Sequence, residues 1–505
     1  MQNFNPSQLK AIQHQGSHLL IVAGPGTGKT HTLTHRIAQI VPQLSGSQKI
    51  LAITFTNKAA QEMRDRLSTL TSNHQDLIMV GTFHQFCLQI LRQYIEKTEL
   101  PNNFRVAQEK EIQQSIKNIW PNVKLREQKA IQNKMSLWKS TQFDLPILDE
   151  VLAYNAMLRK EGLLDFDDLL LETLYLLRKN EDVLTQARET FRFIFVDEYQ
   201  DINRVQYELL KCLIGPTNEL TAIGDPHQAI YGFRGADAEY FERFTNDFPN
   251  TVVLSLEDNY RSAQNILSAS QQVIAKLKSK EIPDLVAKIY SQGRLVIYAS
   301  HTDRAEAEYV VHNIEKMVGG TSMFSQDSGR VDRATEGDVG FGDIAVLYRL
   351  HSQRHALQEA FDRSGIPYHV SGAKASLEFE DDICPPREEE VTLDVEKVSL
   401  MTIHAAKGLE FSVVFIVGCE ENILPLNLEG LVSSEDEERR LFYVGMTRAR
   451  ERLFLTYSQE RLIYGKKVFH EPSRFLTDIE EQLKEYELSQ AIRPPKKEDP
   501  QITFF

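Results

Sequence analysis

The fold of this 505-residue chain is decided by the segment Leu19-Leu-Ile-Val-Ala-Gly-Pro-Gly-Thr-Gly-Lys-Thr30. An apolar run, Ser17–Ala23, leads into a glycine-rich turn, and the turn leads into the helix-like run Thr30–Ile40. Glycines let backbone N–H groups curl around a phosphate, and the positive end of the helix dipole then faces the anion. Ala23 stands where the strict motif has Gly, which is a small departure. The segment predicts an α/β domain that binds a nucleotide.

A second motif supplies the acidic groups that such a site needs. The buried-looking strand Phe193–Val196 is followed directly by Asp197 and Glu198. Asp197 would bind Mg²⁺, directly or through water, and Glu198 would polarise the attacking water. Taken alone, the first motif has a simpler interpretation as a glycine-rich turn that binds nothing. The second motif alone has a simpler interpretation as a solvated acidic loop. Together they favour a nucleotide site, whose phosphate contacts are predicted at Ala23, Gly24, Pro25, Gly26, Thr27, Gly28, Lys29 and Thr30, with Thr30 as a second metal ligand.

Short apolar runs alternate with longer helical stretches along most of the chain, which is typical of α/β layers around a parallel sheet. Between Leu88 and Thr190 the alternation stops, and Leu and Ile recur at three- and four-residue spacing, as in Leu163–Leu177. We therefore expect a helical insertion within the first sheet domain. The expected strands are Ser17–Ala23, Ile50–Phe55, Phe193–Val196, Thr221–Gly224, Val252–Leu256, Ile344–Tyr348, Ser399–Thr402 and Val413–Gly418.

Composition narrows the class of protein further. The chain has 57 Lys and Arg against 71 Asp and Glu, a net charge of −14, so bulk charge does not coat a nucleic acid, although a local basic groove is compatible with it. Four separated cysteines without a CxxC pair argue against a zinc site or a disulfide scaffold. No apolar run reaches the roughly 18 residues of a membrane span, and the start is not that of a signal peptide. We expect a cytoplasmic protein with no membrane partner.

Several polar stretches are expected outside the folded core. Gly319–Gly342 is interpreted as a loop, Glu378–Glu390 with its seven acidic residues as a solvated connector, and Pro494–Pro500 as an extended linker. A closing helix is predicted from Ser473 onward by the spacing of Phe475, Ile479, Leu483 and Tyr486.

In their order along nearly the whole chain, the motifs resemble those of the superfamily 1 DNA helicases of the UvrD/Rep/PcrA type. Phe4–Gln8 is similar to that family's adenine-reading motif, and Ile223–Ala236 is similar to its coupling motif. The remaining matches are Thr54–Ala60, Gly81–His84, Asn259–Ser262, Met401–Phe411 and Glu438–Ala449. The resemblance implies an α/β fold with two RecA-like P-loop sheet domains and a helical insertion in the first, and it implies ATP with Mg²⁺ as cofactors.

The resemblance also implies roles around the nucleotide. Gln8 would read adenine, Tyr260 would stack on it and Glu410 would meet the ribose, with Arg36 as a further contact. Arginines from the second sheet domain would neutralise charge on the transferred phosphoryl group, which makes hydrolysis conditional on closure. Either arginine alone would be read as a surface ion-pair residue. The implied catalytic set is Lys29, Asp197, Glu198, Gln228, Arg261 and Arg448.

Single-stranded DNA would cross the tops of both sheet domains. Aromatic side chains can stack on unpaired bases, and Phe233 is the first choice because Gly232 and Arg234 flank it in a loop-like segment. Phe55 ends an apolar strand and has a core position as its alternative. The implied DNA contacts are Phe55, Asn57, His84, Tyr231, Phe233, Arg234, Arg349 and His404.

The implied domain organisation has three units. Residues 1–90 and 191–257 form the ATP-binding domain (1A), residues 91–190 form the helical insertion (1B), and residues 258–478 form the second RecA-like domain (2A). Residues 479–505 hold the end of the closing helix and a flexible tail. Family members usually insert a large helical domain, 2B, ahead of Met401–Phe411; here only a short connector near 373–398 stands in that place.

The implied activity is that of an ATP-dependent helicase or translocase moving 3′→5′ on single-stranded DNA, in repair, recombination or replication, with tailed duplexes as further substrates. Two alternatives remain: a translocase that strips proteins with little unwinding, and a nucleotide-gated binding module without a motor. The intact catalytic set disfavours the module. The last residues, Gln501-Ile-Thr-Phe-Phe505, resemble the peptide with which bacterial replication and repair proteins bind the sliding clamp. A frayed end, or an aromatic clip onto the protein's own surface, is the alternative.

Overall fold

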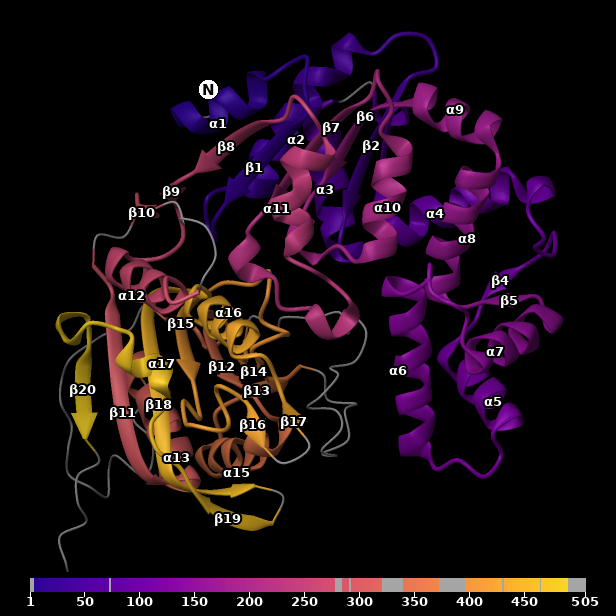
Figure 1. Cartoon of the computed structure of the whole chain (residues 1–505). Helices are drawn as coiled ribbons and strands as arrows, with labels where there is room; N and C mark the ends of the chain where they lie inside the picture. The colour runs from indigo at the N-terminus through magenta and orange to yellow at the C-terminus, as the bar shows by residue number, and fades with distance from the viewer. Residues whose placement is uncertain are drawn as a thin grey trace, which may run out of the picture.

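Two parallel sheets and a helical body make up the computed structural model of the chain (Figure 1). It describes residues 4–71, 74–277, 284–289, 292–319, 339–371, 396–428, 431–463 and 465–488. The predicted strands are all present, and their ends shift by at most two residues. The predicted α/β class with two parallel-sheet domains is confirmed.

The first sheet has the order β3-β2-β6-β7-β1-β8, and every pairing in it is parallel. Its inner strands are apolar on both faces because helices cover both sides, as parallel sheets require. The strands are β1 (Leu19–Ala23), β2 (Lys49–Thr54), β3 (Ile78–Thr82), β6 (Phe191–Val196), β7 (Glu219–Gly224) and β8 (Val252–Leu256). The helices around them are α1 (Pro6–Gln13), α2 (Lys29–Ile40), α3 (Asn57–Leu70), α4 (Phe83–Gln93), α10 (Arg204–Leu213) and α11 (Glu239–Asp247).

The helical body stands beside the first sheet, and α6, its longest helix, lies on the side of this body turned toward the second sheet domain (Figure 1). Lys139 on α6 has a fully buried side chain, and its ammonium group contacts Asp165 at 2.8 Å and Asp168 at 2.7 Å, which ties α6 to the start of α8. The helices are α5 (Glu109–Ile119), α6 (Leu125–Thr141), α7 (Asp149–Lys160), α8 (Phe166–Lys179) and α9 (Glu181–Thr190). They confirm the helices predicted between Leu88 and Thr190; the short pair β4 (Arg105–Val106) and β5 (Leu163–Leu164) was not predicted.

The second sheet has the order β13-β14-β12-β15-β18-β11-β20, with β19 paired to β18. All its pairings are parallel except the β18–β19 hairpin. The strands are β11 (Arg294–Thr302), β12 (Ile344–Tyr348), β13 (Tyr368–Val370), β14 (Val398–Thr402), β15 (Phe411–Ile416), β18 (Ala449–Ile463), β19 (Lys466–Phe469) and β20 (Glu485–Leu488). The helices are α12 (Gln264–Ile274), α13 (Asp303–Val318), α15 (Arg354–Ser364), α16 (Glu435–Met446) and α17 (Arg474–Thr477).

The predicted closing helix is wrong. Only the turn α17 and the short 3-10 turn Glu481–Leu483 are helical, and the chain then forms β20, which extends the second sheet beyond residue 478. Phe475 in α17 and Ile479 just after it are both buried, so the apolar spacing reflects packing of this turn and the residues that follow it. Arg294 on β11 pairs with Glu485 at 2.7 Å and with Glu487 at 2.8 Å, which holds this segment extended along β11.

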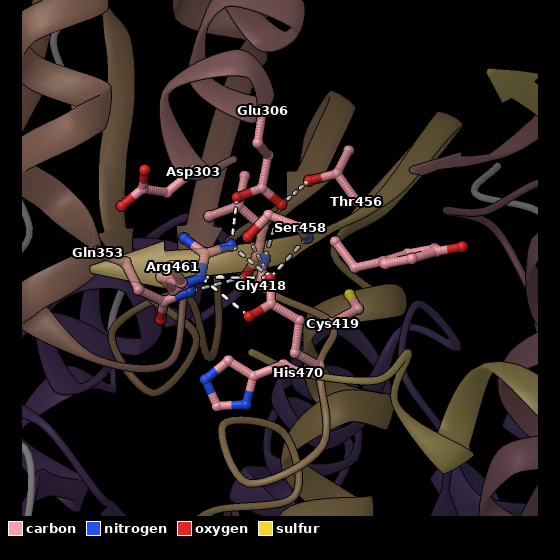
Figure 2. A network of polar contacts seen from close by, with 12 residues as sticks. Asp303, Glu306, Gln353, Gly418, Cys419, Thr456, Ser458, Arg461 and His470 are labelled. Carbon is pink, nitrogen blue, oxygen red and sulfur yellow. Dashed lines mark hydrogen bonds and ion pairs between the residues drawn. The ribbon is translucent and has the colours of Figure 1, made fainter. Parts of the chain in front are cut away.

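A buried ion cluster lies at the carboxyl end of β15 (Figure 2). Arg461 on β18 lies 2.5 Å from both Glu306 on α13 and Glu420 in the turn after β15, and no side chain of the three is more than 3% exposed. Burial opposes ionisation of Glu420, yet the charge of Arg461 outweighs it and lowers the pKa of that carboxyl. Glu306 also accepts a hydrogen bond from the Gly418 amide at 3.0 Å. One cluster therefore joins β15, β18 and α13.

Gly418 is required at this turn for two reasons. Its φ of 72° lies in the left-handed region, which side chains disfavour. A Cβ atom there would also lie 2.0 Å from the side-chain amide nitrogen (Nε2) of Gln353.

Several predictions fall on residues outside the described part of the chain. They are most of the Gly319–Gly342 loop, the acidic connector Glu378–Glu390, the Pro494–Pro500 linker and the tail motif at 501–505. Within the described residues, no helix is both long and apolar enough to cross a membrane.

Replacing Arg461 by Leu should lower the free energy of unfolding of the second sheet by roughly 3–5 kcal/mol, because two carboxylates would stay buried without their cation. Arg474→Leu is the matched control: this arginine is half-exposed, pairs with Glu421 and Glu435, and should cost less than about 1 kcal/mol. Urea denaturation followed by circular dichroism measures both. Equal losses in the two variants would contradict the role given to Arg461.

Candidate nucleotide site and DNA-facing surface

The phosphate loop closes tightly between β1 and α2. Gly26 and Gly28 have φ values of 68° and 80°, which only glycine adopts without strain. The Thr27 hydroxyl donates to the Gly24 carbonyl at 2.9 Å, and the Lys29 ammonium group lies 3.3 Å from the carbonyls of Ala23 and Gly24. The loop thus presents a lysine and the start of α2 at one point, which is a suitable place for a phosphate chain.

The two acidic residues after β6 have opposite electrostatic environments. Burial raises the pKa of Asp197 to about 7, and the adjacent Glu198 charge adds to this effect. Burial also opposes ionisation of Glu198, but the ammonium groups of Lys29 and Lys407 outweigh it and lower its pKa. Glu198 therefore stays a carboxylate, as a group that polarises water must. The Thr30 hydroxyl lies 3.5 Å from Asp197, and a hydroxyl beside a carboxylate fits the oxygen donors that Mg²⁺ prefers.

A chain of side-chain hydrogen bonds leads from Glu198 to the second sheet. Glu198 accepts from Gln200 at 2.5 Å, and Gln200 accepts from the Asp225 amide at 2.9 Å. Asp225 then accepts from Gln228 at 2.8 Å, and Gln228 accepts from Arg448 at 3.3 Å. Gln200 and Asp225 were not among the predicted site residues, although both lie inside the motif segments. Their closeness in the sequence to Glu198 and Gln228 was the one signal that could have identified them.

Lys407, inside the motif Met401–Phe411, is a further residue to which the sequence analysis gave no role. Its ammonium group contacts both oxygens of Asp201, at 2.7 and 2.5 Å, and donates to the Gln228 carbonyl at 2.7 Å. It also lies 4.9 Å above the ring of Tyr231. Burial raises the pKa of Asp201 to about 7, although Lys407 acts in the opposite direction. Lys407 comes from the segment after β14, so it joins the second sheet to the first.

The two predicted arginines converge on the site from the second sheet. Arg448 is 1% exposed, and burial, with a further contribution from the charge of Arg261, lowers its pKa to about 9. Its guanidinium donates to the Leu409 carbonyl at 3.1 Å as well as to Gln228. Arg261 pairs with Glu410 at 2.6 Å. Two positively charged groups that repel each other favour an anion between them, such as a phosphate.

The predicted adenine contacts lie on both sides of the phosphate loop. Gln8, in the first turn of α1, donates to the Thr27 carbonyl at 3.1 Å. The Tyr260 amide donates to the Gly26 carbonyl at 2.8 Å, and its ring is 37% exposed. Asn259 was not predicted, yet its side chain donates to the Pro25 carbonyl at 2.6 Å. The loop is therefore held by residues from both sides of the interface.

Arg36 is not placed as predicted. Its guanidinium is 1% exposed and donates to the carbonyls of Ala11 at 2.9 Å and His14 at 2.5 Å and to the Thr221 hydroxyl at 3.0 Å. These bonds fasten α1 to α2 and β7, so the prediction of a direct nucleotide contact is wrong. Glu410, the predicted ribose contact, pairs with Arg261 and Arg450 in this structure.

Aromatic side chains form a row at the same edge of the two sheets. The rings of Phe55 and Tyr231 are stacked with centroids 5.3 Å apart, Tyr231 meets Phe233 at 6.0 Å, and Phe233 meets His404 at 5.9 Å. The guanidinium of Arg234 lies 5.2 Å from the Tyr231 ring. All four rings are partly exposed. The structure thus gathers these predicted DNA contacts in one place, with His404 from the second sheet and the others from the first.

The remaining predicted DNA contacts are less uniform. Asn57 is exposed and accepts from Gln85 at 3.0 Å, and the half-buried ring of His84 meets Phe166 edge-on at 5.5 Å. Arg349 is 7% exposed, and its guanidinium is bound to Glu438 at 2.8 Å. The prediction that Arg349 offers its charge to the DNA backbone is therefore wrong for this arrangement, because the charge is buried and paired.

A phosphate loop, an acidic pair and arginines from a second parallel sheet define the class of P-loop proteins built from two RecA-like domains. The UvrD/REP helicase N-terminal domain family matches residues 4–249, and the UvrD-like helicase C-terminal domain family matches residues 254–378 and 383–460. The chain belongs to this helicase family.

Curated relatives agree with this assignment. The ATP-dependent DNA helicase PcrA of Staphylococcus aureus (strain Mu50) is 28% identical over 669 aligned positions, which cover 98% of this chain and 89% of the relative. The PcrA helicase of Staphylococcus epidermidis (strain ATCC 12228) is 28% identical over 652 positions, which cover 96% of this chain and 87% of the relative.

Replacing Phe233 by Ala should weaken affinity for single-stranded DNA by about 1–3 kcal/mol, the size of one stacking contact. ATP hydrolysis without DNA should survive, because the ring lies in the aromatic row and not at the phosphate loop. Fluorescence anisotropy with a labelled oligonucleotide measures the affinity. Unfolding of the DNA-free variant, seen by its melting temperature, would show that Phe233 is a core residue instead.

Proposed function

We propose that this protein is an ATP-dependent DNA helicase or translocase that moves 3′→5′ along single-stranded DNA. One observation carries the proposal. Gln228, which accepts from Arg448 at the phosphate site, is three residues from Tyr231 in the aromatic row. The same short segment therefore touches both sites, so a change at one is felt at the other. Membership of the UvrD-like family and the names of the PcrA relatives support ATP and DNA as the two ligands.

The proposed roles follow from the geometry around the loop. Lys29 and the start of α2 would hold the phosphates, Thr30 and Asp197 would hold Mg²⁺, and Glu198 would polarise the attacking water. Gln8 and Tyr260 hold the base. When bound, the metal ion would neutralise phosphate charge. Arg261 and Arg448 reach the phosphate only while the second sheet is docked on the first, so hydrolysis and domain closure depend on each other.

In the proposed cycle, nucleotide lies between the sheet domains at 1–90 with 191–257 and at 258–478, and residues 91–190 flank the DNA path. Closure brings the arginines to the phosphate, and product release separates the sheets. Alternating grip on the strand by the two halves of the aromatic row would then give directional steps. The 3′→5′ direction rests on the family resemblance alone.

Replacing Glu198 by Gln should abolish ATP hydrolysis stimulated by single-stranded DNA while ATP still binds, because the side chain keeps its shape and loses its charge. Lys29→Ala is the companion variant and should weaken nucleotide binding itself. Turnover is measured by phosphate release with and without DNA, and affinity with a fluorescent ATP analogue. Near-normal turnover in Glu198→Gln would remove this residue from its proposed role.

We also propose that the 2B domain is reduced here to the connector near 373–398. The alignment with the S. aureus relative spans 669 positions, whereas this chain has 505 residues, so the relative has a long stretch without a counterpart. The C-terminal family match is broken between residues 378 and 383, inside this connector. This favours the second candidate function, a translocase that displaces proteins and unwinds little on its own.

Translocation on single-stranded DNA should therefore be easier to detect than duplex unwinding by the monomer. Strand displacement on 3′-tailed and 5′-tailed duplexes is compared with displacement of streptavidin from a biotinylated single strand, at the same rate of ATP hydrolysis. The 3′-tailed duplex should be the better of the two duplexes. Efficient unwinding of long duplexes by single bound monomers would contradict the loss of 2B function.

Partners and setting complete the proposal. The proposed substrates are single-stranded DNA and tailed duplex DNA. The proposed process is DNA repair, recombination or replication, and the proposed location is the cytoplasm. The tail 501–505 is proposed to bind a sliding clamp, with Gln501 at the mouth of the groove and Ile502, Phe504 and Phe505 in its pocket. Clamp affinity of the chain with and without these five residues is the relevant comparison.

A further inference from the structure

A carboxylate of the second sheet domain binds the backbone of the DNA-facing surface. Glu437, in the first turn of α16, accepts a hydrogen bond from the Gly232 amide at 3.0 Å. Gly232 is exposed and opens the short turn Gly232–Arg234, which carries Phe233. This contact crosses from one sheet domain to the other beside the aromatic row.

A side chain at position 232 would crowd this approach. A Cβ atom there would lie 3.1 Å from both carboxylate oxygens of Glu437, which is tighter than ordinary contact. The amide is therefore accessible to an anion that comes close, and Glu437 is the anion that occupies it in this structure.

The helix that carries Glu437 also leads to the phosphate site. α16 ends at Met446, and Arg448 follows two residues later with its guanidinium on Gln228. A helix of this length is a rigid rod of roughly 18 Å at 1.5 Å per residue. One end of α16 thus holds the turn that carries Phe233, and the other end positions an arginine for the γ-phosphate.

Acidic residues at a helix start have a simpler explanation, since they favour the helix dipole. Asp436 serves that purpose equally well and is exposed. Glu438 is buried and neutralised by Arg349 at 2.8 Å. Glu437 differs from both because it reaches a backbone donor of the other sheet domain. Burial raises the pKa of Glu437 against the effect of this hydrogen bond, and the charge of Glu438 adds to the increase.

We propose that Glu437 is a positioning residue that ties the Gly232–Arg234 turn to α16 while DNA is absent, and that a DNA phosphate replaces its carboxylate at the Gly232 amide. The inference rests on the proposed function, because it requires single-stranded DNA at this surface. Phosphate oxygens commonly accept from backbone amides in protein–DNA contacts, so one anion exchanges for another at the same donor. Arg234, the last residue of the turn, adds attraction for the phosphate. The exchange releases α16 from the turn and so reports DNA to Arg448.

The test compares Glu437→Gln, Glu437→Ala and Asp436→Asn, with binding of a labelled oligothymidine and ATP hydrolysis as readouts. Asp436→Asn is the matched control, since it removes the same charge from the same helical turn. Glu437→Gln should tighten DNA binding roughly three- to tenfold at low salt, because a charge that competes with phosphate is gone. The gain should shrink as salt rises. Asp436→Asn should change affinity less than about twofold.

The second readout, ATP hydrolysis, separates the coupling between DNA binding and hydrolysis from the effect of charge on DNA affinity. Glu437→Ala removes the acceptor altogether, so hydrolysis without DNA should rise and the stimulation ratio should fall, while Glu437→Gln keeps an acceptor and most of the stimulation. Melting temperatures confirm that each variant is folded. If Glu437→Gln and Asp436→Asn bind DNA equally, or if Glu437→Ala keeps the wild-type stimulation ratio, the inference is overturned. If DNA does not stimulate the wild-type protein at all, it is the proposed function that fails.

Discussion

The buried ion pair between Lys407 and Asp201 is the contact on which the two-sheet arrangement depends. Lys407 follows β14 in the second sheet, and Asp201 follows β6 in the first, and their side chains are 7% and 1% exposed. A buried ion pair is tolerated when further hydrogen bonds satisfy its members, and the Gln228 carbonyl supplies one. Separation of the sheets would leave both charges without their partners. The position of Arg261 and Arg448 beside the phosphate loop therefore relies on this pair.

The phosphate loop and the aromatic row lie close together because of where β7 ends. Parallel strands present their carboxyl ends at one edge, and ligands bind there. Asp225 and Gln228 follow β7 directly and face the phosphate loop, whereas Tyr231 and Phe233, a few residues later, lie in the aromatic row. The chain needs no long pathway between the two sites. Lys407 reinforces the connection, since the same ammonium group contacts Gln228 and the ring of Tyr231.

Local patterns predicted the edge strand β8 as well as inner strands such as β6, but they missed β18 and β20. β6 is a continuous apolar run, which its central position in the sheet demands. β18 continues from Ala449 into Arg450, Glu451 and Arg452, and its extended form comes from pairing with β15 and β11. β20 is an edge strand whose short sequence carries a helix-like spacing from the preceding turn. Its conformation follows from the available edge of β11, which no local pattern reveals.

The sequence by itself determined the phosphate loop, the acidic pair and the order of the motifs, because glycine conformation, helix dipoles and strand burial act within a few residues. Only the tertiary structure decided which charged groups face the site. Arg36 and Arg349 are buried and bind α1 and Glu438, whereas Lys407 and Asn259, which lie in quoted motifs but were given no role, reach the first sheet domain. The partner of a charged side chain lies up to hundreds of residues away, and packing alone brings the two together.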